Sequence, residues 1–247
     1  MIPKIIHYCW LSDDPIPVEF QKYIETWKVK MPDFQLMLWN FSKFNKESSL
    51  WVKQAFDNKK YAFAADYIRL YALYEYGGFY LDMDVEVVKS FNEFIQLNTA
   101  ICFEHDGNGK LEMAAFGVSP KADWIKKCLD YYQNRPFIKK DGSFDMKVIP
   151  EIAGEILHKD YNIVKVTSVS EAINLTKTGS FPVFTPDFFS PKSYVSNEIE
   201  LTENTVSIHH FASSWMKPTE KIKLRMWNCL KTRVPMLASL IKLTFKR

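Results

Sequence analysis

The sequence predicts an α/β fold, a mixed sheet flanked by helices. Short apolar runs alternate with amphipathic segments from the first residues onward, which is the pattern of strands joined by helical crossovers. With 47% hydrophobic and 15% aromatic residues among 247, the chain can bury one large core. We therefore expect a main domain over residues 1–215 and a separate tail over residues 216–247.

The elements predicted for the first half follow from the spacing of apolar residues. Residues 2–10 form a short buried strand, which ends where prolines and aspartates begin. Helical spacing over residues 18–27 and alternation over 34–39 predict a helix and a second strand, and residues 46–60 predict a short helix. Strand, helix and strand in this order favour a parallel arrangement, which binds ligands at the carboxyl ends of its strands.

The second half of the chain continues the alternation. Its predicted strands are residues 100–104, 114–118 and 162–166, and its predicted helices are residues 124–132 and 149–157. A glycine-containing turn over residues 106–109 joins the first two of these strands. Prolines and serines in residues 183–194 predict an ordered loop with aromatic anchors.

Residues 62–88 place a helix, a glycine pair and an acidic strand next to one another. Asp66 and Arg69 stand three positions apart on one flank of the helix. Gly77-Gly78 ends the helix, because glycine accepts positive φ without steric cost. On spacing alone, Asp66 and Arg69 make an ordinary surface ion pair, which contributes little to stability.

The strand after the glycines, residues 79–87, alternates apolar and polar side chains. Asp82, Asp84 and Glu86 would share its polar face with Tyr80, although like charges on one face repel one another. A cation such as Mn²⁺ or Mg²⁺ would offset the repulsion, because it prefers oxygen ligands and substrate phosphates. The other interpretation is the solvated face of a half-buried strand.

The run ADYIRLYALYEYGGFYLDMDV, residues 65–85, resembles the signature D-x-x-R, L-x-x-x-G-G-x-Y-x-D-x-D of glycosyltransferases with a DXD-type sugar-transferase domain. This family includes yeast initiating mannosyltransferases and bacterial capsular polysaccharide transferases, and the catalytic domains of clostridial glucosylating toxins resemble it more distantly. The resemblance implies a GT-A-like (Rossmann-like) fold. It also implies metal-dependent sugar transfer with retention of anomeric configuration.

The resemblance assigns roles to the residues that match the signature. Asp82 and Asp84 would bind Mn²⁺ or Mg²⁺, with Asp82 also contacting the donor. Arg69 would contact phosphate or sugar, Asp66 would accept a hydrogen bond from a sugar hydroxyl, and Tyr80 would offer a phenol to the donor. Asp82, Asp84, Arg69 and Asp66 are thus the expected catalytic residues.

The N-terminal run I-P-K-x-I-H-x-x-W also matches the family, whose tryptophan lies near the nucleotide base. Trp10 is the matching position, and core packing explains it equally well. His7 is expected to be a satisfied core histidine rather than a ligand. Glu112 stands where related transferases often carry Asn, so the acceptor side of the pocket departs from the family pattern.

A second stretch with site character is TVSIHHFASSW, residues 205–215, which resembles the H-x-x-x-S-W pattern that closes the family's site. A histidine there could complete the coordination of the metal, with His209 favoured over His210, and Ser214 or Trp215 could hold the leaving phosphate. The alternative is a histidine pair on the surface.

Residues 216–247 hold nine Lys or Arg against one acid, whereas the net charge of the whole chain is only +3. Apolar residues alternate with these charges, so an amphipathic helical tail on an anionic membrane surface is one expectation. A packed helix with a solvated basic face is the other. The acidic remainder of the chain argues against nucleic acid as a partner.

Four widely spaced cysteines suggest neither a disulfide framework nor a zinc site. The N-terminus shows no signal peptide, and the sequence has no apolar span of membrane length. We therefore expect a cytoplasmic protein, peripheral on the inner face of the cytoplasmic membrane.

The expected function is sugar transfer from a nucleotide-sugar donor to a glycan or glycolipid acceptor in the synthesis of a surface glycan. A UDP-sugar is the favoured donor and GDP-mannose is the alternative. The sequence leaves a covalent intermediate and a same-face displacement both open. Two rival functions remain: an aspartate-nucleophile phosphatase, whose D-x-D-x-V loop DMDVE also fits, and a non-catalytic nucleotide-sugar-binding protein.

Overall fold

The computed structural model describes residues 1–106 and 109–212. The predicted tail, Ser214 and Trp215 lie outside the described residues. Among the helices described, none is long and apolar enough to cross a membrane.

The main sheet has five strands in the order β2-β1-β3-β6-β5. β1 (Ile5–Cys9) lies between β2 (Gln35–Trp39) and β3 (Gly78–Leu81) and is parallel to both. β6 (Ala115–Val118) is antiparallel to β3 and to the short edge strand β5 (Thr99–Ala100). The mixed sheet expected from the sequence is therefore confirmed.

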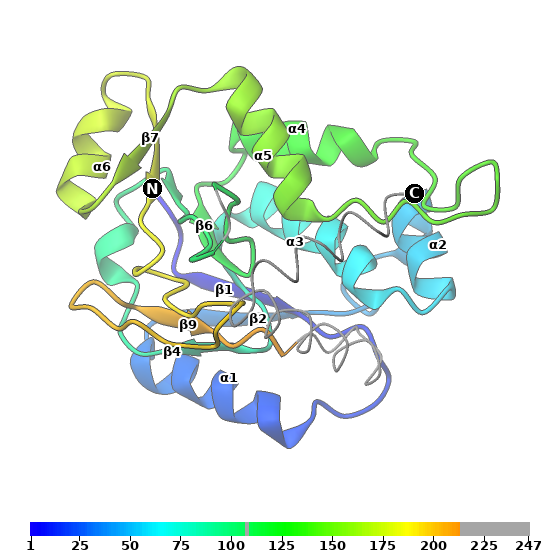
Figure 1. The fold of residues 1–247 in the computed structure, drawn as a ribbon. Helices are drawn as coiled ribbons and strands as arrows, with labels where there is room; N and C mark the ends of the chain where they lie inside the picture. The colour runs from blue at the N-terminus through cyan, green and yellow to red at the C-terminus, as the bar shows by residue number, and fades with distance from the viewer. Residues whose placement is uncertain (107–108, 213–247) are drawn as a thin grey trace, which may run out of the picture.

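Helices cover both faces of this sheet (Figure 1). α2 (Leu50–Asp57), α3 (Tyr61–Tyr76), α4 (Asp123–Tyr132) and α5 (Ile149–Asp160) share one apolar core, which includes Tyr80 of β3. α1 (Val18–Lys30) covers the opposite face, in a second core with Phe79 and Leu81. Because side chains alternate along a strand, β3 contributes to both cores and is buried on both faces.

Two small sheets extend the fold. β4 (Val85–Val87) pairs antiparallel with β9 (Ser207–His209), the last described strand. β7 (Ile163–Val166) and β8 (Phe181–Phe184) are parallel and are joined by α6 (Val169–Thr176). The sequence predicted neither α6 nor β8.

The predicted continuous strand over residues 79–87 is wrong. β3 ends at Leu81, residues 82–84 turn, and β4 begins in a different sheet. The backbone N–H of Val85 donates to the carbonyl of Asp82 across this turn at 3.0 Å. Trp27 of α1 anchors the new direction, since its Nε1 donates to the Val85 carbonyl at 2.7 Å. The three acids consequently do not share one strand face.

The glycine pair makes the tight passage from α3 into β3 sterically feasible. Gly77 and Gly78 have φ values of 62° and 103°, which L-residues with side chains rarely adopt. A Cβ atom on Gly78 would lie only 2.6 Å from the Ile5 carbonyl oxygen. β3 can therefore lie directly beside β1, and its carboxyl end carries the first aspartate of the site.

His7 is a fully buried histidine with both ring nitrogens bonded. Its Nε2 lies 2.7 Å from the carbonyl oxygen of Gly77, and Trp39 Nε1 donates to its Nδ1 at 3.0 Å. A carbonyl only accepts and an indole N–H only donates, so the imidazole is neutral with its proton on Nε2. The expectation of a satisfied core histidine is confirmed.

We expect His7 to make the protein less stable in acid. Burial lowers the pKa of His7 to about 4 from 6.5. Below pH 6.5 the unfolded chain binds a proton here that the folded chain does not, so stability present above pH 6.5 is lost as pH falls to about 4. The loss is about 3 kcal/mol in total. Urea unfolding of the wild type and of His7→Gln at several pH values measures it.

The His7→Gln variant retains a donor for Gly77 and an acceptor for Trp39, and it does not titrate. The wild type is expected to lose its stability advantage over this variant as the pH falls through that window. Because all other titrating groups are common to both proteins, a difference that stays constant with pH would contradict the prediction.

Candidate metal and donor-binding site

Three predicted ligands converge at the carboxyl edge of the main sheet. One ligand atom from each of Asp82, Asp84 and His209 lies within 4.8 Å of the other two. Asp82 follows β3, Asp84 lies in the turn before β4, and His209 ends β9. β4 and β9 pair with Val85 opposite His209, and this pairing brings the imidazole beside the aspartates.

Asp84 is held as an ionised carboxylate. Its Oδ2 accepts a hydrogen bond from the backbone N–H of Ala212 at 2.6 Å and lies 3.6 Å from Nε2 of His209. Burial alone would raise the pKa of Asp84, but the positive charge of His209 and the Ala212 N–H outweigh it and hold the pKa at about 2. The backbone of the same residue also accepts from the N–H of His210 at 3.0 Å.

Asp82 is positioned by a buried arginine. One guanidinium nitrogen of Arg69 lies 3.1 Å from Asp82 Oδ1 and 3.2 Å from Asp66 Oδ1, and another donates to the carbonyl of Met113. The guanidinium carbon lies 4.4 Å from the centre of the Tyr80 ring. Arg69 is 6% exposed and Asp66 is 7% exposed. The pair is therefore not the surface ion pair that its spacing alone suggested.

Arg69, Asp66 and Tyr80 are buried among protein partners. The bonded guanidinium nitrogens of Arg69 face protein acceptors, and Tyr80 is only 1% exposed beneath the guanidinium. Burial raises the pKa of Asp66 to about 6, although Arg69 opposes the shift. Arg69 contacts Asp82 directly, and Asp66 contacts the same guanidinium. Direct contact of Arg69, Asp66 and Tyr80 with the donor stays a prediction.

His209 has a carboxylate beside each ring nitrogen. Its Nε2 faces Asp84, and its Nδ1 lies 3.1 Å from Oε2 of Glu112. Burial disfavours the charged imidazole, but the negative Glu112 and Asp84 outweigh burial and put the pKa of His209 well above its usual value. Two carboxylates and an imidazole form a donor set that suits a divalent cation, which would take the place of the Nε2 proton.

His210 contacts other residues than those that surround His209. Its Nε2 lies 2.8 Å from Oε2 of Glu86, and its ring stacks on Tyr23 with 4.8 Å between the ring centres. The expectation that either histidine could bind the metal thus narrows to His209. Glu86, the third acid of the predicted strand, pairs with His210 and does not join Asp82 and Asp84.

Trp10 lies at the same edge of the sheet as Asp82, because the two residues follow the parallel strands β1 and β3. Its ring packs edge-on against Phe20 of α1, with 6.2 Å between the ring centres. Its Nε1 donates to the carbonyl of Asp14 at 2.7 Å. Contact of this half-buried ring with a nucleotide base stays a prediction.

Two further carboxylates lie near the site: Glu112, which the family pattern had placed on the acceptor side of the pocket, and Glu104, which was not predicted. Glu112 is 1% exposed and is the partner of His209 described above. Glu104 lies in the same hairpin, where its N–H donates to the Lys110 carbonyl at 2.9 Å. Partial burial and the nearby Glu112 raise the pKa of Glu104 to about 7. No local motif marks Glu104 or pairs Glu112 with His209, because both carboxylates approach the site through the hairpin and not through the DXD segment.

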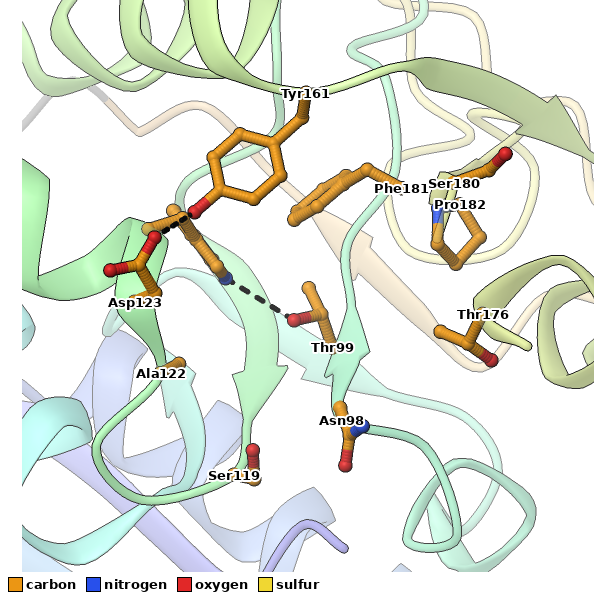
Figure 2. Close-up of a pocket in the computed structure, with 11 residues that line it drawn as sticks. Asn98, Thr99, Ser119, Ala122, Asp123, Tyr161, Thr176, Ser180, Phe181 and Pro182 are labelled. Carbon is orange, nitrogen blue, oxygen red and sulfur yellow. Dashed lines mark hydrogen bonds between the residues drawn. The ribbon is translucent and has the colours of Figure 1, made fainter. Parts of the chain in front are cut away.

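A separate cavity of about 300 Å³ lies at the opposite edge of the main sheet (Figure 2). It is lined by Asn98 and Thr99 at the start of β5, and by Tyr161 and Phe181. β6 runs antiparallel to β3 and to β5, so the start of β5 lies far from the carboxyl end of β3. None of the predicted site residues lines this cavity.

Comparison with known proteins identifies the DXD segment. Residues 17–101 match the family described as the glycosyltransferase sugar-binding region containing a DXD motif. The chain is 29% identical over 153 residues to mannosyl phosphorylinositol ceramide synthase SUR1 of Saccharomyces cerevisiae, covering 58% of this chain and 39% of that protein. It is 35% identical over 91 residues to inositol phosphoceramide mannosyltransferase 3 of Schizosaccharomyces pombe, covering 34% of this chain and 24% of that protein.

A longer match reaches the initiation-specific α-1,6-mannosyltransferase of Candida albicans, at 23% identity over 220 residues, or 81% of this chain and 55% of that protein. The chain spans between 24% and 55% of the length of the curated relatives it matches.

Solved structures with a similar fold include the PaToxG glycosyltransferase, with a TM-score of 0.47, 20% identity and coverage of 64% of this chain and 70% of that one. The galactosyltransferase LgtC gives a TM-score of 0.46 at 14% identity, over 90% and 94% of the two chains. Scores of this size carry no argument about function. The segment that matches the family, residues 17–101, contains residues 65–85 and so confirms the resemblance seen there.

Proposed function

We propose that the protein is a metal-dependent glycosyltransferase, which moves a sugar from a nucleotide-sugar donor to a hydroxyl group of a glycan or glycolipid. The observation that carries the proposal is the convergence of Asp82, Asp84 and His209, because two of the three lie in the segment that matches the family. A D-x-D pair alone is common. A D-x-D pair with an imidazole beside it, brought from a distant strand, supports a built metal site.

Different residues of the chain would bind the metal and position its ligands. Asp82, Asp84 and His209 would hold the cation, and Arg69 fixes the orientation of Asp82. A bound Mn²⁺ or Mg²⁺ ion would supply charge neutralisation for the diphosphate that leaves the sugar.

The names of the relatives support a narrower choice of substrates. Several relatives are named as mannosyltransferases, and some of these act on inositol phosphoceramide by name. For this chain we propose a hexose donor, with GDP-mannose tested beside the UDP-sugars, and a glycolipid as the first acceptor to try. Retention of configuration and a role in surface glycan synthesis belong to the same proposal.

A donor screen tests the proposed function. The full chain is incubated with Mn²⁺ and a panel of UDP- and GDP-sugars, and the release of free nucleoside diphosphate is recorded for each. We expect one donor to be turned over slowly without an acceptor, and a chelator to stop the turnover. Turnover that persists with chelator would contradict metal dependence. Donor binding without turnover would favour the non-catalytic binding protein.

A further inference from the structure

We propose that Glu112 is a positioning residue for the metal site: it fixes the orientation and the tautomer of His209, so that Nε2 presents its lone pair to a divalent cation. The inference rests on the proposed metal-dependent function. It concerns a contact between residues 97 positions apart in the sequence.

The carboxylate of Glu112 is buried and has a partner at each oxygen. Its side chain is 2% exposed, and its own N–H donates to the carbonyl of Cys102 at 2.9 Å. Oε1 accepts from the backbone N–H of Ala114 at 2.7 Å, and Oε2 lies 3.1 Å from Nδ1 of His209. Both oxygens therefore act as acceptors, and the position of neither can adjust freely.

This geometry decides which imidazole nitrogen carries the hydrogen. An ionised carboxylate has no hydrogen to donate, so the Nδ1 of His209 must donate to it. In the neutral ring the lone pair is then on Nε2, the nitrogen that lies 3.6 Å from Asp84 Oδ2. A carboxylate bonded to the far nitrogen of a metal-binding histidine fixes the ring and strengthens the near nitrogen as a ligand.

A glutamine in place of Glu112 would reverse this arrangement without changing the shape of the side chain. The backbone N–H of Ala114 requires an oxygen, which leaves the amide NH₂ group facing Nδ1 of His209. Nδ1 would then have to accept, and the ring hydrogen would move to Nε2, where it blocks the metal. Turning the amide over leaves two donors facing each other at Ala114, which is also unfavourable in a buried position.

Titration of the full chain with Mn²⁺ alone, followed by the EPR signal of free Mn²⁺, tests the inference without any sugar transfer. We expect Glu112→Gln to weaken Mn²⁺ binding by about 10- to 100-fold. The matched control is Glu104→Gln with all titrations at pH 8, where a carboxyl with a pKa of about 7 is largely ionised; it removes a negative charge from the same hairpin and leaves Glu112 beside His209. This control should change the affinity much less. Equal losses in the two variants would show that only charge matters and would overturn the inference.

A double-mutant cycle separates positioning of His209 from a general structural role. In a His209→Ala background, Glu112→Gln should have little further effect on Mn²⁺ affinity, because the ring that it positions is gone. A loss of the same size in both backgrounds would overturn the inference, as would wild-type affinity in the Glu112→Gln variant. Circular dichroism confirms that each variant is folded.

The same titration separates failure of the metal-dependent function from failure of the role of Glu112. A wild-type chain that binds no Mn²⁺ would overturn both the metal-dependent function and the role of Glu112. A wild-type chain that binds Mn²⁺ and turns over a donor, with Glu112→Gln unchanged, would overturn the role of Glu112 alone.

Discussion

Replacement of Asp84 by asparagine is expected to lower donor turnover by about 1,000-fold while the protein stays folded. Asparagine keeps the size of the side chain, and its carbonyl oxygen can still accept from the N–H of Ala212. The variant loses the negative charge that a divalent cation requires, and its NH₂ group then faces the site. Release of nucleoside diphosphate at saturating donor and Mn²⁺ measures the effect.

The control for this variant is Glu86→Gln, two positions along the chain. Glu86 carries the same charge, but it pairs with His210 and lies outside the cluster of Asp82, Asp84 and His209. Its replacement should leave most of the activity in place. Full activity of Asp84→Asn, or an equal loss in the two variants, would refute the assignment of the metal site to the three clustered residues.

Replacement of Arg69 by methionine is expected to destabilise the fold by about 3 kcal/mol. The variant leaves two carboxylates, Asp66 and Asp82, without the cation that lies between them. Removing one partner of a buried pair costs far more than the pair contributes, because the remaining charge is stranded. The estimate is at the lower end of the usual range, since the Asp82 side chain is 30% exposed. Urea unfolding followed by circular dichroism measures the loss.

A double variant, Arg69→Met with Asp66→Asn, provides the control. It removes the stranded charge on Asp66, so part of the lost stability should return. A loss below about 1 kcal/mol in the single variant would mean that the pair behaves like an exposed ion pair, as the i,i+3 spacing alone suggests.

Apolar periodicity predicted most helices and strands, because it reports directly on which face of an element is buried. It failed at the turn after β3, where the alternation of residues 79–87 continues without interruption on both sides of the turn. The alternation of apolar residues correctly indicates that Leu81 and Val85 are buried. It does not show that they belong to different sheets, because both residues lie in extended segments. Tyr80 was misplaced for a related reason: a central strand covered by helices on both faces buries its polar positions too.

The residues of the site that lie in recognisable local motifs could be predicted from the sequence. Asp82, Asp84, Arg69 and His209 were expected from local motifs, and the first three lie close together in the sequence. Glu112 could not be assigned to His209, because the contact depends on how the hairpin of residues 102–112 meets β9 in space. The role of Arg69 also needed the fold, since the spacing to Asp66 does not reveal that the pair is buried.

The pairing of β4 with β9 has a consequence for the order in which the protein matures. During synthesis the two aspartates leave the ribosome on the order of ten seconds before His209 does. Until β9 docks, the early acids have no imidazole beside them and no Ala212 N–H to hold Asp84. A cation that binds Asp82, Asp84 and His209 together more tightly than it binds the two aspartates alone would therefore stabilise the docked strand β9 by mass action. The ion and the docked strand β9 would thus stabilise each other, and metal binding would mark a chain in which β9 has paired with β4.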